Sequence, residues 1–308
     1  MLSTRFSRIA LLPMLLLSTR GFAQDGSQAR EYGPWVWGLQ GGAVEQFEAG
    51  LAGDSGEFSV SRSYIEPSLS YAWDRQTSLS LSLGYGRSDY DFSSDASIED
   101  LPPWERIEDY RVSMPVRFAP TDRSKVIVIP SVRSYVEEGT SLGDGLTAGV
   151  LAGASWRFSD RLELGPGFGW FSELGGGSNA FPILLVDWEL ADGLSLTTGR
   201  GIAASQGPGL SLEYALDSKW KMALSGRYEK TRFALNGEGS AEGGFGEERS
   251  LPLLLSVEYS PWPMTSVSAV LGAEFEGSLR LEDGNGSRIA ESRYDTAPVL
   301  GLVFSSRF

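Results

Sequence analysis

The residues of this sequence that could do chemistry are its carboxylates, because the chain contains neither histidine nor cysteine. Without histidine no side chain ordinarily ionises near neutral pH, and without cysteine a thiolate nucleophile is missing as well. Acidic pairs such as Asp187 with Glu189, or Glu274 with Glu276, could act as the acid and base of a glycoside hydrolase, which needs two carboxyl groups about 5–10 Å apart. Acids along the wall of a polar interior explain these pairs more simply. We therefore expect no catalytic residues and no enzymatic activity.

Two glycine-containing segments resemble ligand-binding loops. The segment 283–287 has oxygen ligands at alternate positions, like the start of a calcium loop, but Arg288 stands where glycine is required and Tyr294 where the bidentate acid is required. The segment 165–169 has alternating glycines inside a predicted strand and opens no helix, so it is not a dinucleotide-binding loop. We expect a hairpin tip in the first case and an interior wall free of side chains in the second. No metal and no cofactor are expected.

Charged side chains fall almost entirely on one face of the predicted strands. Successive side chains of a strand point to opposite faces, so Tyr110, Val112 and Met114 share one face while Asp109 and Arg111 share the other. A Lys or Arg on the lipid face of a membrane barrel costs about 2–4 kcal/mol at the bilayer midplane. The pattern therefore predicts a barrel with an apolar outside and a polar lumen. The charged residues predicted to line the lumen are Asp109, Arg111, Arg117, Arg133, Arg157, Glu163, Asp187, Glu189, Glu213, Lys221, Arg227, Glu229, Glu258, Glu274 and Glu276.

These lumen charges are of both signs, which leaves two interpretations. If they pair across the lumen, they form a salt-bridged plug. If acids and bases separate to opposite walls, they create the transverse field of a diffusion pore.

Aromatic residues of the apolar face collect next to the predicted short turns. This belt consists of Trp73, Phe118, Trp156, Phe158, Trp188, Trp220, Tyr259 and Phe308. A sparser set lies toward the other strand ends and consists of Tyr85, Tyr110, Trp170, Tyr228 and Phe275. Two aromatic belts about one bilayer apart are typical of membrane barrels.

The elements that must position these residues are strands. Alternation and turn residues predict fourteen, with twelve as the alternative, at roughly 35–47, 57–73, 77–92, 105–119, 125–137, 145–158, 161–172, 180–190, 194–203, 208–216, 219–234, 249–260, 264–281 and 292–308. We expect a bulge in 194–203, where Gly199 and Gly201 interrupt the pattern. Short polar turns alternate with longer connections, of which 93–103 and 236–248 are long and acidic. The fold class is thus all-β, a transmembrane antiparallel up-and-down barrel.

The amino terminus indicates export. Residues 1–23 combine Arg5 and Arg8 with a short apolar run and end in Gly21-Phe22-Ala23, the pattern of a cleaved secretory signal. Residues 24–34 form a short polar tail, expected in the periplasm, and 35–308 form the barrel. The net charge of −14 argues against nucleic acid as a partner.

The chain resembles bacterial outer-membrane β-barrels, whose last strand ends on an aromatic residue like Phe308. This resemblance implies the outer membrane of a two-membrane bacterium, with its lipids and lipopolysaccharide and the barrel-insertion machinery as partners, the last through the C-terminal strand. The ending from Asp295 to Phe308 is similar to an uncharacterised outer-membrane barrel family of unknown function. Fatty-acid and aromatic-hydrocarbon transporters also have fourteen strands, but they carry an N-terminal hatch for which residues 24–34 are too short.

Two hypotheses of function follow. The first is a passive, porin-like channel or small-solute transporter with the mixed-charge lumen as its selectivity element. The alternative is a non-conducting structural or surface-interaction barrel that acts through the acidic loops 93–103 and 236–248.

Overall fold

The computed structural model describes residues 34–53, 56–93, 96–98, 104–198, 209–237 and 241–308. The expected signal peptide, nearly all of the polar tail, and the expected bulge near Gly199 and Gly201 lie outside the described residues.

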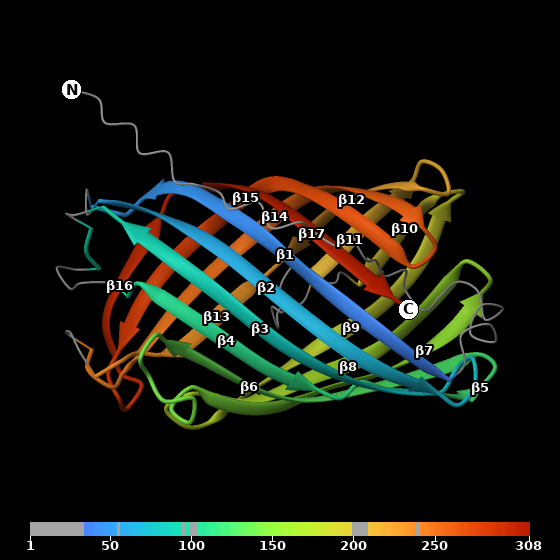
Figure 1. Cartoon of the computed structure of the whole chain (residues 1–308), viewed down its shortest axis with the longest axis horizontal. Coiled ribbons are helices and arrows are strands. Elements are labelled where there is room, and N and C mark those ends of the chain that lie inside the picture. The colour runs from blue at the N-terminus through green and yellow to red at the C-terminus, as the bar shows by residue number, and fades with distance from the viewer. Residues whose placement is uncertain (1–33, 54–55, 94–95, 99–103, 199–208, 238–240) are drawn as a thin grey trace.

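The described residues form one closed antiparallel sheet of seventeen strand segments (Figure 1). These are β1 (Trp35–Gly50), β2 (Glu57–Ala72), β3 (Ser78–Phe92), β4 (Arg106–Ser113), β5 (Val116–Thr121), β6 (Ser124–Glu137), β7 (Leu146–Ser159), β8 (Leu162–Ser172), β9 (Ser178–Ala191), β10 (Leu194–Thr198), β11 (Gly209–Ala215), β12 (Trp220–Arg227), β13 (Glu229–Ala234), β14 (Phe245–Trp262), β15 (Thr265–Glu282), β16 (Arg288–Tyr294) and β17 (Ala297–Arg307). The sheet closes because β1 pairs with β2 on one edge and with β17 on the other.

Three pairs of segments are the two halves of one barrel strand. β4 and β5 both lie between β3 and β6, and they are separated at Met114 and Pro115, where proline lacks a backbone donor. β12 and β13 both pair with β14, and β16 and β17 both pair with β15. The barrel within the described residues therefore has fourteen strands, as the alternation predicted.

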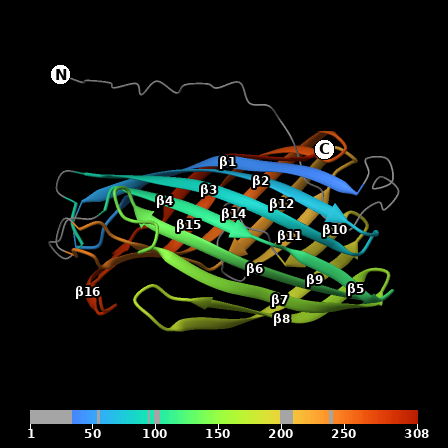
Figure 2. The same cartoon turned by 60° about the horizontal axis from the view of Figure 1, so that its bottom comes forward.

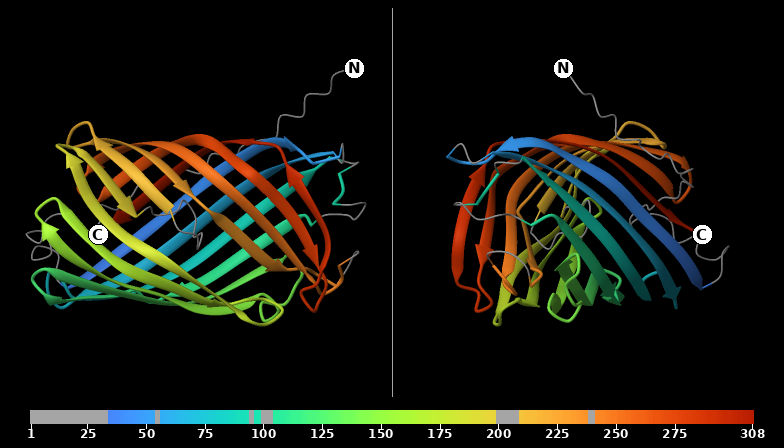
Figure 3. Two further views of the ribbon diagram at one scale, coloured as in Figure 1. Left: turned by 180° about the vertical axis from the view of Figure 1, so that it is seen from behind. Right: turned by 60° about the vertical axis from the view of Figure 1, so that its left-hand side comes forward.

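The two ends of the barrel differ. The turn end has tight connections such as those between β5 and β6 and between β7 and β8, and the C-terminus lies there (Figures 1 and 2). The loop end has the longer connections, including those after β3 and after β13. Figure 3 shows the strands running obliquely from one end to the other, as barrel closure requires. Among the described residues, no helix is long and apolar enough to cross a membrane.

At the loop end the barrel is pinched. β13 meets β6, a strand on the nearly opposite side of the barrel, through a parallel bridge between Ala234 and Val136. The Asn236 N–H donates to Glu137 Oε2 at 2.9 Å just beyond this bridge. The pinch divides the loop end into a part enclosed by β1–β4 and β13–β17 and a part bounded by β7–β12.

One predicted boundary is wrong at this end. β14 begins at Phe245, so Glu247 and Glu248 belong to a strand rather than to an acidic loop. Both side chains are buried and form ion pairs, Glu248 with Arg62 and Glu247 with Arg249. The strand can therefore continue beyond its apolar residues with charged ones.

Candidate functional site in the barrel interior

The outer surface carries apolar side chains at alternate strand positions. On β14, Leu251 and Leu253 are exposed, whereas Pro252 and Leu254, which alternate with them, are buried. Every member of the predicted turn-end belt except Tyr259 is an exposed large aromatic, and half-buried Tyr259 packs on Trp220 with ring centroids 4.7 Å apart. An apolar surface of this extent is energetically favourable in contact with lipid and unfavourable in contact with water. The fold is that of a transmembrane β-barrel.

The interior enclosed by β1–β4 and β13–β17, which we call the packed side, is filled at the loop end. Its apolar cluster includes Phe58, Val60, Trp104, Phe233 and Leu279, each no more than 2% exposed. Trp104 from the segment before β4 contacts Phe233 of β13 edge to face at 4.8 Å, across the interior. Aromatic contacts of this kind lock two walls together. The packed side is therefore closed at the loop end.

Beneath that cluster lies a buried ion-pair network centred on Arg62 of β2. Its guanidinium contacts Glu248 of β14 at 2.8 Å and Glu274 of β15 at 3.4 Å. The hydroxyl of Tyr90 donates to Glu248 at 2.6 Å, and that of Tyr294 lies 3.2 Å from both carboxylates. Because β2 is not a neighbour of β14 or β15, these contacts span the interior, as the plug interpretation expects.

The other interior face, formed by β6–β12 and called the accessible side, is different. Its charges near the turn end pair along the wall between nearby strands: Lys125 lies 2.7 Å from Glu163, and Lys221 lies 3.1 Å from Glu213. Asp187 belongs to the same inward row as Glu163 and is exposed. Pairs along a wall leave the space in front of it free of cross-links. The plug interpretation thus describes the packed side, whereas these acids and bases of the accessible side pair along one wall rather than across the interior.

Most of the predicted lumen residues point to the interior, but the structure spreads them over both sides. Asp109, Arg111 and Glu274 belong to the packed side, where Arg111 contacts Asp109 at 2.6 Å and Glu66 at 3.2 Å. Arg133 on β6 and Arg227 and Glu229 at the junction of β12 and β13 lie near the boundary, with Arg227 3.5 Å from Glu229. Arg157, Glu163, Asp187, Glu189, Glu213 and Lys221 are on the accessible side, and next to it are Arg117 on β5, opposite β6, and Glu258 on β14, opposite β12.

The prediction for Glu276 is wrong. The register between β14 and β15 shifts between Arg249 and Leu251, which leaves an extra residue on β15, and Glu276 has a φ of 50° and is exposed. A bulge reverses the parity of the strand beyond it. Leu279, four residues beyond Phe275 and on the apolar face by simple alternation, therefore lies in the interior cluster and is fully buried.

Sequence reasoning missed two sets of interior residues. Arg62 was not assigned, although it alternates with Val60 and Tyr64 on β2, because a single basic residue in a serine-rich strand gave little signal. The second set lies on β9, where Phe181, Ile183 and Leu185 occupy inward positions. Both parities of this strand are apolar, and that signal was available in the sequence.

The inward glycines of β7 and β8 explain how these side chains fit. A Cβ on Gly153 would approach Leu185 Cδ1 to 2.7 Å, one on Gly167 would lie 3.5 Å from Ile183 Cβ, and one on Gly169 would collide with the Phe181 ring. The glycines thus form a floor over which the β9 side chains lie. The expectation that segment 165–169 leaves the wall bare is wrong, because neighbouring side chains cover it.

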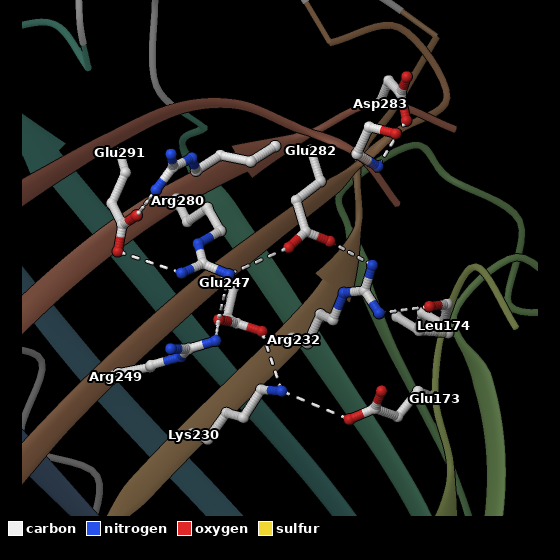
Figure 4. Close-up of polar contacts among 12 residues, drawn as sticks. Glu173, Leu174, Lys230, Arg232, Glu247, Arg249, Arg280, Glu282, Asp283 and Glu291 are labelled. Carbon is white, nitrogen blue, oxygen red and sulfur yellow. Dashed lines mark hydrogen bonds and ion pairs between the residues drawn. The ribbon is translucent and has the colours of Figure 1, made fainter. Parts of the chain in front are cut away.

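A charged cluster occupies the outward face of β13–β15 beyond the bulge, with Lys230, Arg232, Glu247, Arg249, Arg280 and Glu282 as its members (Figure 4). Glu247 contacts Arg249, and its other oxygen lies 3.2 Å from Lys230, which reaches Glu173 of the β8–β9 connection at 3.4 Å. Arg232 contacts Glu282 and the carbonyl of Leu174. The cluster and the β8–β9 connection together line a polar cavity of about 280 Å³. Through Lys230 and Arg232 the cluster therefore fixes the β8–β9 connection to β13, the strand that forms the pinch.

The segment at Asp283 is the predicted hairpin tip. Asp283 Oδ1 accepts the N–H groups of Asn285 at 2.9 Å and Ser287 at 2.8 Å. The carboxylate therefore organises the turn between β15 and β16. Within the described part of the chain, no group of acidic side chains is arranged to hold a metal ion.

Comparison with known proteins gives structural similarity only. No protein-family model matches the chain. No curated protein sequence matches it either. An outer-membrane channel from Pseudomonas putida F1 is 8% identical, with a TM-score of 0.47 over 87% of this chain and 95% of that one. The P. putida toluene transporter TodX is 8% identical, with a TM-score of 0.46 over 91% and 92%. The translocator domain of the autotransporter NalP from Neisseria meningitidis is 13% identical, with a TM-score of 0.37 over 88% of each chain.

Proposed function

We propose that this protein is an outer-membrane channel for small solutes, with its path along the accessible side. The observation that carries the proposal is the difference in exposure between the two interior faces. Inward residues of the accessible side such as Leu185, Asp187 and Lys221 are half-buried or exposed, whereas Val60, Phe233 and Leu279 on the packed side are at most 1% exposed. An inward side chain of a closed barrel is accessible only if space lies in front of it. The packed side serves as structural support for that path.

The predicted lumen charges then act as the selectivity element on one side only. Asp187 and Glu189 lie next to each other on the inward face of β9, and neither forms an ion pair with another described residue, whereas Glu163 and Glu213 are neutralised by lysines. Uncompensated acids in a narrow, low-dielectric path attract cations. We therefore expect weak cation selectivity.

Single-channel conductance of the refolded protein in a planar lipid bilayer tests this proposal. Discrete steps with a reversal potential that favours cations are expected. Replacing both Asp187 and Glu189 by lysine should move the reversal potential toward anions, because it adds positive charge to the path. The matched control is Arg111→Gln with Asp109→Asn, an interior pair on the packed side. A refolded barrel that never conducts would contradict the proposal.

A second candidate function is supported by the outward face above the apolar band. Lys230, Arg249 and Arg293 occupy one cross-strand row with Ser278 on β13–β16, and Leu251 lies one step nearer the membrane on β14. A basic row at this height fits the phosphate groups of lipopolysaccharide, which would make the barrel a surface-interaction protein. Replacing the three basic residues by glutamine should abolish co-purification of lipopolysaccharide, whereas glutamine at Arg87 and Arg106 should not. Equal retention by both variants would contradict this role.

The proposal includes export through a signal at 1–23 and insertion directed by the C-terminal strand. The last aromatic residue, Phe308, pairs through its backbone with Trp37, with Phe308 N–H donating to the Trp37 carbonyl at 2.8 Å. The terminal residue is thus part of the seam that closes the barrel.

A further inference from the structure

The accessible side has an apolar wall inside the barrel, formed by Ile127, Ile129, Leu151, Phe181, Ile183 and Leu185 on β6, β7 and β9. Cross-strand register places Ile127, Gly153, Gly167 and Ile183 in one row, and Ile129, Leu151, Gly169 and Phe181 in the next. Each row contains at least one glycine, which has no side chain, so the side chains of the other residues in the row lie over the glycine backbone. The wall is therefore continuous from β6 to β9.

Barrel stability does not explain this wall. Apolar interior residues on the packed side, such as Phe58, Val60 and Leu279, are buried against a second wall, which is how apolar burial contributes free energy. The six wall residues are each only half-buried although they point inward. A half-exposed apolar surface inside a water-accessible path remains available to a ligand.

The wall ends on polar groups toward the turn end. In the next rows of β6–β9 lie Lys125, Arg157, Glu163, Asp187 and Glu189; within the described part of the chain Lys125 and Glu163 form an ion pair, and Asp187 and Glu189 form none. The carboxylates of Asp187 and Glu189, which have no ion-pair partner among the described residues, disfavour an anionic group at that position and accept hydrogen bonds from a hydroxyl. Apolar contacts and polar ones thus lie in adjacent rows.

We propose that the solutes carried by this barrel are small amphipathic molecules, with an aliphatic or aromatic body on the β6–β9 wall and an uncharged hydroxyl end toward Asp187 and Glu189. This inference rests on the proposed channel function and specifies its substrate class. A strictly hydrophilic solute gains nothing from the wall. Each methylene group of the solute that the wall covers should tighten binding about fourfold.

Photolabelling of the refolded barrel in lipid nanodiscs tests the inference. The probe is octanol carrying a diazirine, and the labelled residues are located by mass spectrometry. Saturable labelling, suppressed by excess octanol, is expected at Phe181, Ile183 and Leu185. The outward residues Leu184 and Trp188 of the same strand face lipid, so their labelling should not saturate. Competition should strengthen about fourfold per methylene from hexanol to octanol.

Variants sharpen the test. Ile183→Asn with Leu185→Asn should remove the saturable labelling, and Ser195→Asn, an inward polar position on β10, should retain it. Ile183→Ala with Leu185→Ala preserves apolar character and should weaken competition by octanol at least tenfold; it replaces the asparagine pair if that pair does not fold. Labelling confined to outward positions, or labelling that never saturates, would overturn the inference.

The same preparations separate this inference from the channel proposal. Conductance without saturable labelling refutes the amphipathic substrate and leaves the channel. Saturable inward labelling without conductance confirms the binding wall and refutes the channel.

Discussion

The packed side and the accessible side of this barrel use inward residues in opposite ways. On the packed side, Phe233 and Leu279 meet Trp104 and Phe58 across the interior, and Arg62 bridges two acids of distant strands. On the accessible side, lysines pair with acids of nearby strands along the same wall. One barrel thus has half of its interior packed like the core of a soluble protein and the other half lined by accessible side chains that pair along one wall. Stability and function should therefore respond to mutation on different sides.

The largest contrast is expected for truncated aromatics. Phe233→Ala should lower the free energy of unfolding by about 4 kcal/mol, because it leaves a cavity in a fully buried cluster. Phe181→Ala on the accessible side should lower it by about 1 kcal/mol, because that ring is half exposed. Urea unfolding in lipid vesicles, followed by tryptophan fluorescence, measures both. Equal losses would show that the accessible side is packed as well.

The next contrast concerns charge. Arg62→Ala should cost about 3 kcal/mol, because it leaves buried Glu248 and Glu274 without their cation. Arg157→Ala should cost less than about 0.5 kcal/mol, since this inward arginine is exposed. The same unfolding assay applies. A large loss for Arg157→Ala would place it in a buried network and contradict the division.

The pinch itself can be loosened. Glu137→Ala removes the carboxylate that accepts the Asn236 N–H, a contribution of about 1–2 kcal/mol. The bridge between β6 and β13 should then open more often, and the unit conductance should rise or become noisier. Glu138→Ala, next to it but paired with Arg106 on the outer surface at 2.6 Å, is the control. Unchanged conductance in the Glu137 variant would show that the pinch does not limit the path.

The smallest effect on stability is expected for Asp74, which lies in the turn between β2 and β3 and belongs to neither the packed nor the accessible side. The pKa of Asp74 is lowered by hydrogen bonds from the backbone N–H groups of Gln76 and Thr77, each 2.7 Å from Oδ1. A carboxyl group with a lowered folded-state pKa stabilises the protein above its unfolded pKa, near 4, and loses that contribution as pH falls through the folded value. Asp74→Asn should thus flatten the pH dependence of unfolding below about pH 4 and leave it unchanged at neutral pH. An unchanged acid profile would contradict this role.

The strand number, the alternation of charged and apolar faces, and the turn-end aromatic belt could be predicted from the sequence alone. These follow from local rules, because a strand with period two must place charge away from lipid. Asp109, Arg111 and Trp188 were placed correctly on their faces by that rule alone. The apolar inward positions of β9 were also visible in the sequence, although no rule of alternation singles them out.

Which inward residues contact one another depends on the tertiary structure and could not be predicted. The bulge at Glu276 and Gly277 is an insertion in β15 relative to its partner β14, so beyond it Leu279, which has the parity of Phe275, turns inward. The bridge between Ala234 and Val136 joins strands on opposite sides of the barrel, and its partners depend on the curvature of all the strands between them. The period of two determines whether a side chain points to the lipid or to the interior. Which residue it contacts across the interior depends on the shape of the closed sheet as a whole. The division into a packed side and an accessible side arises at that level.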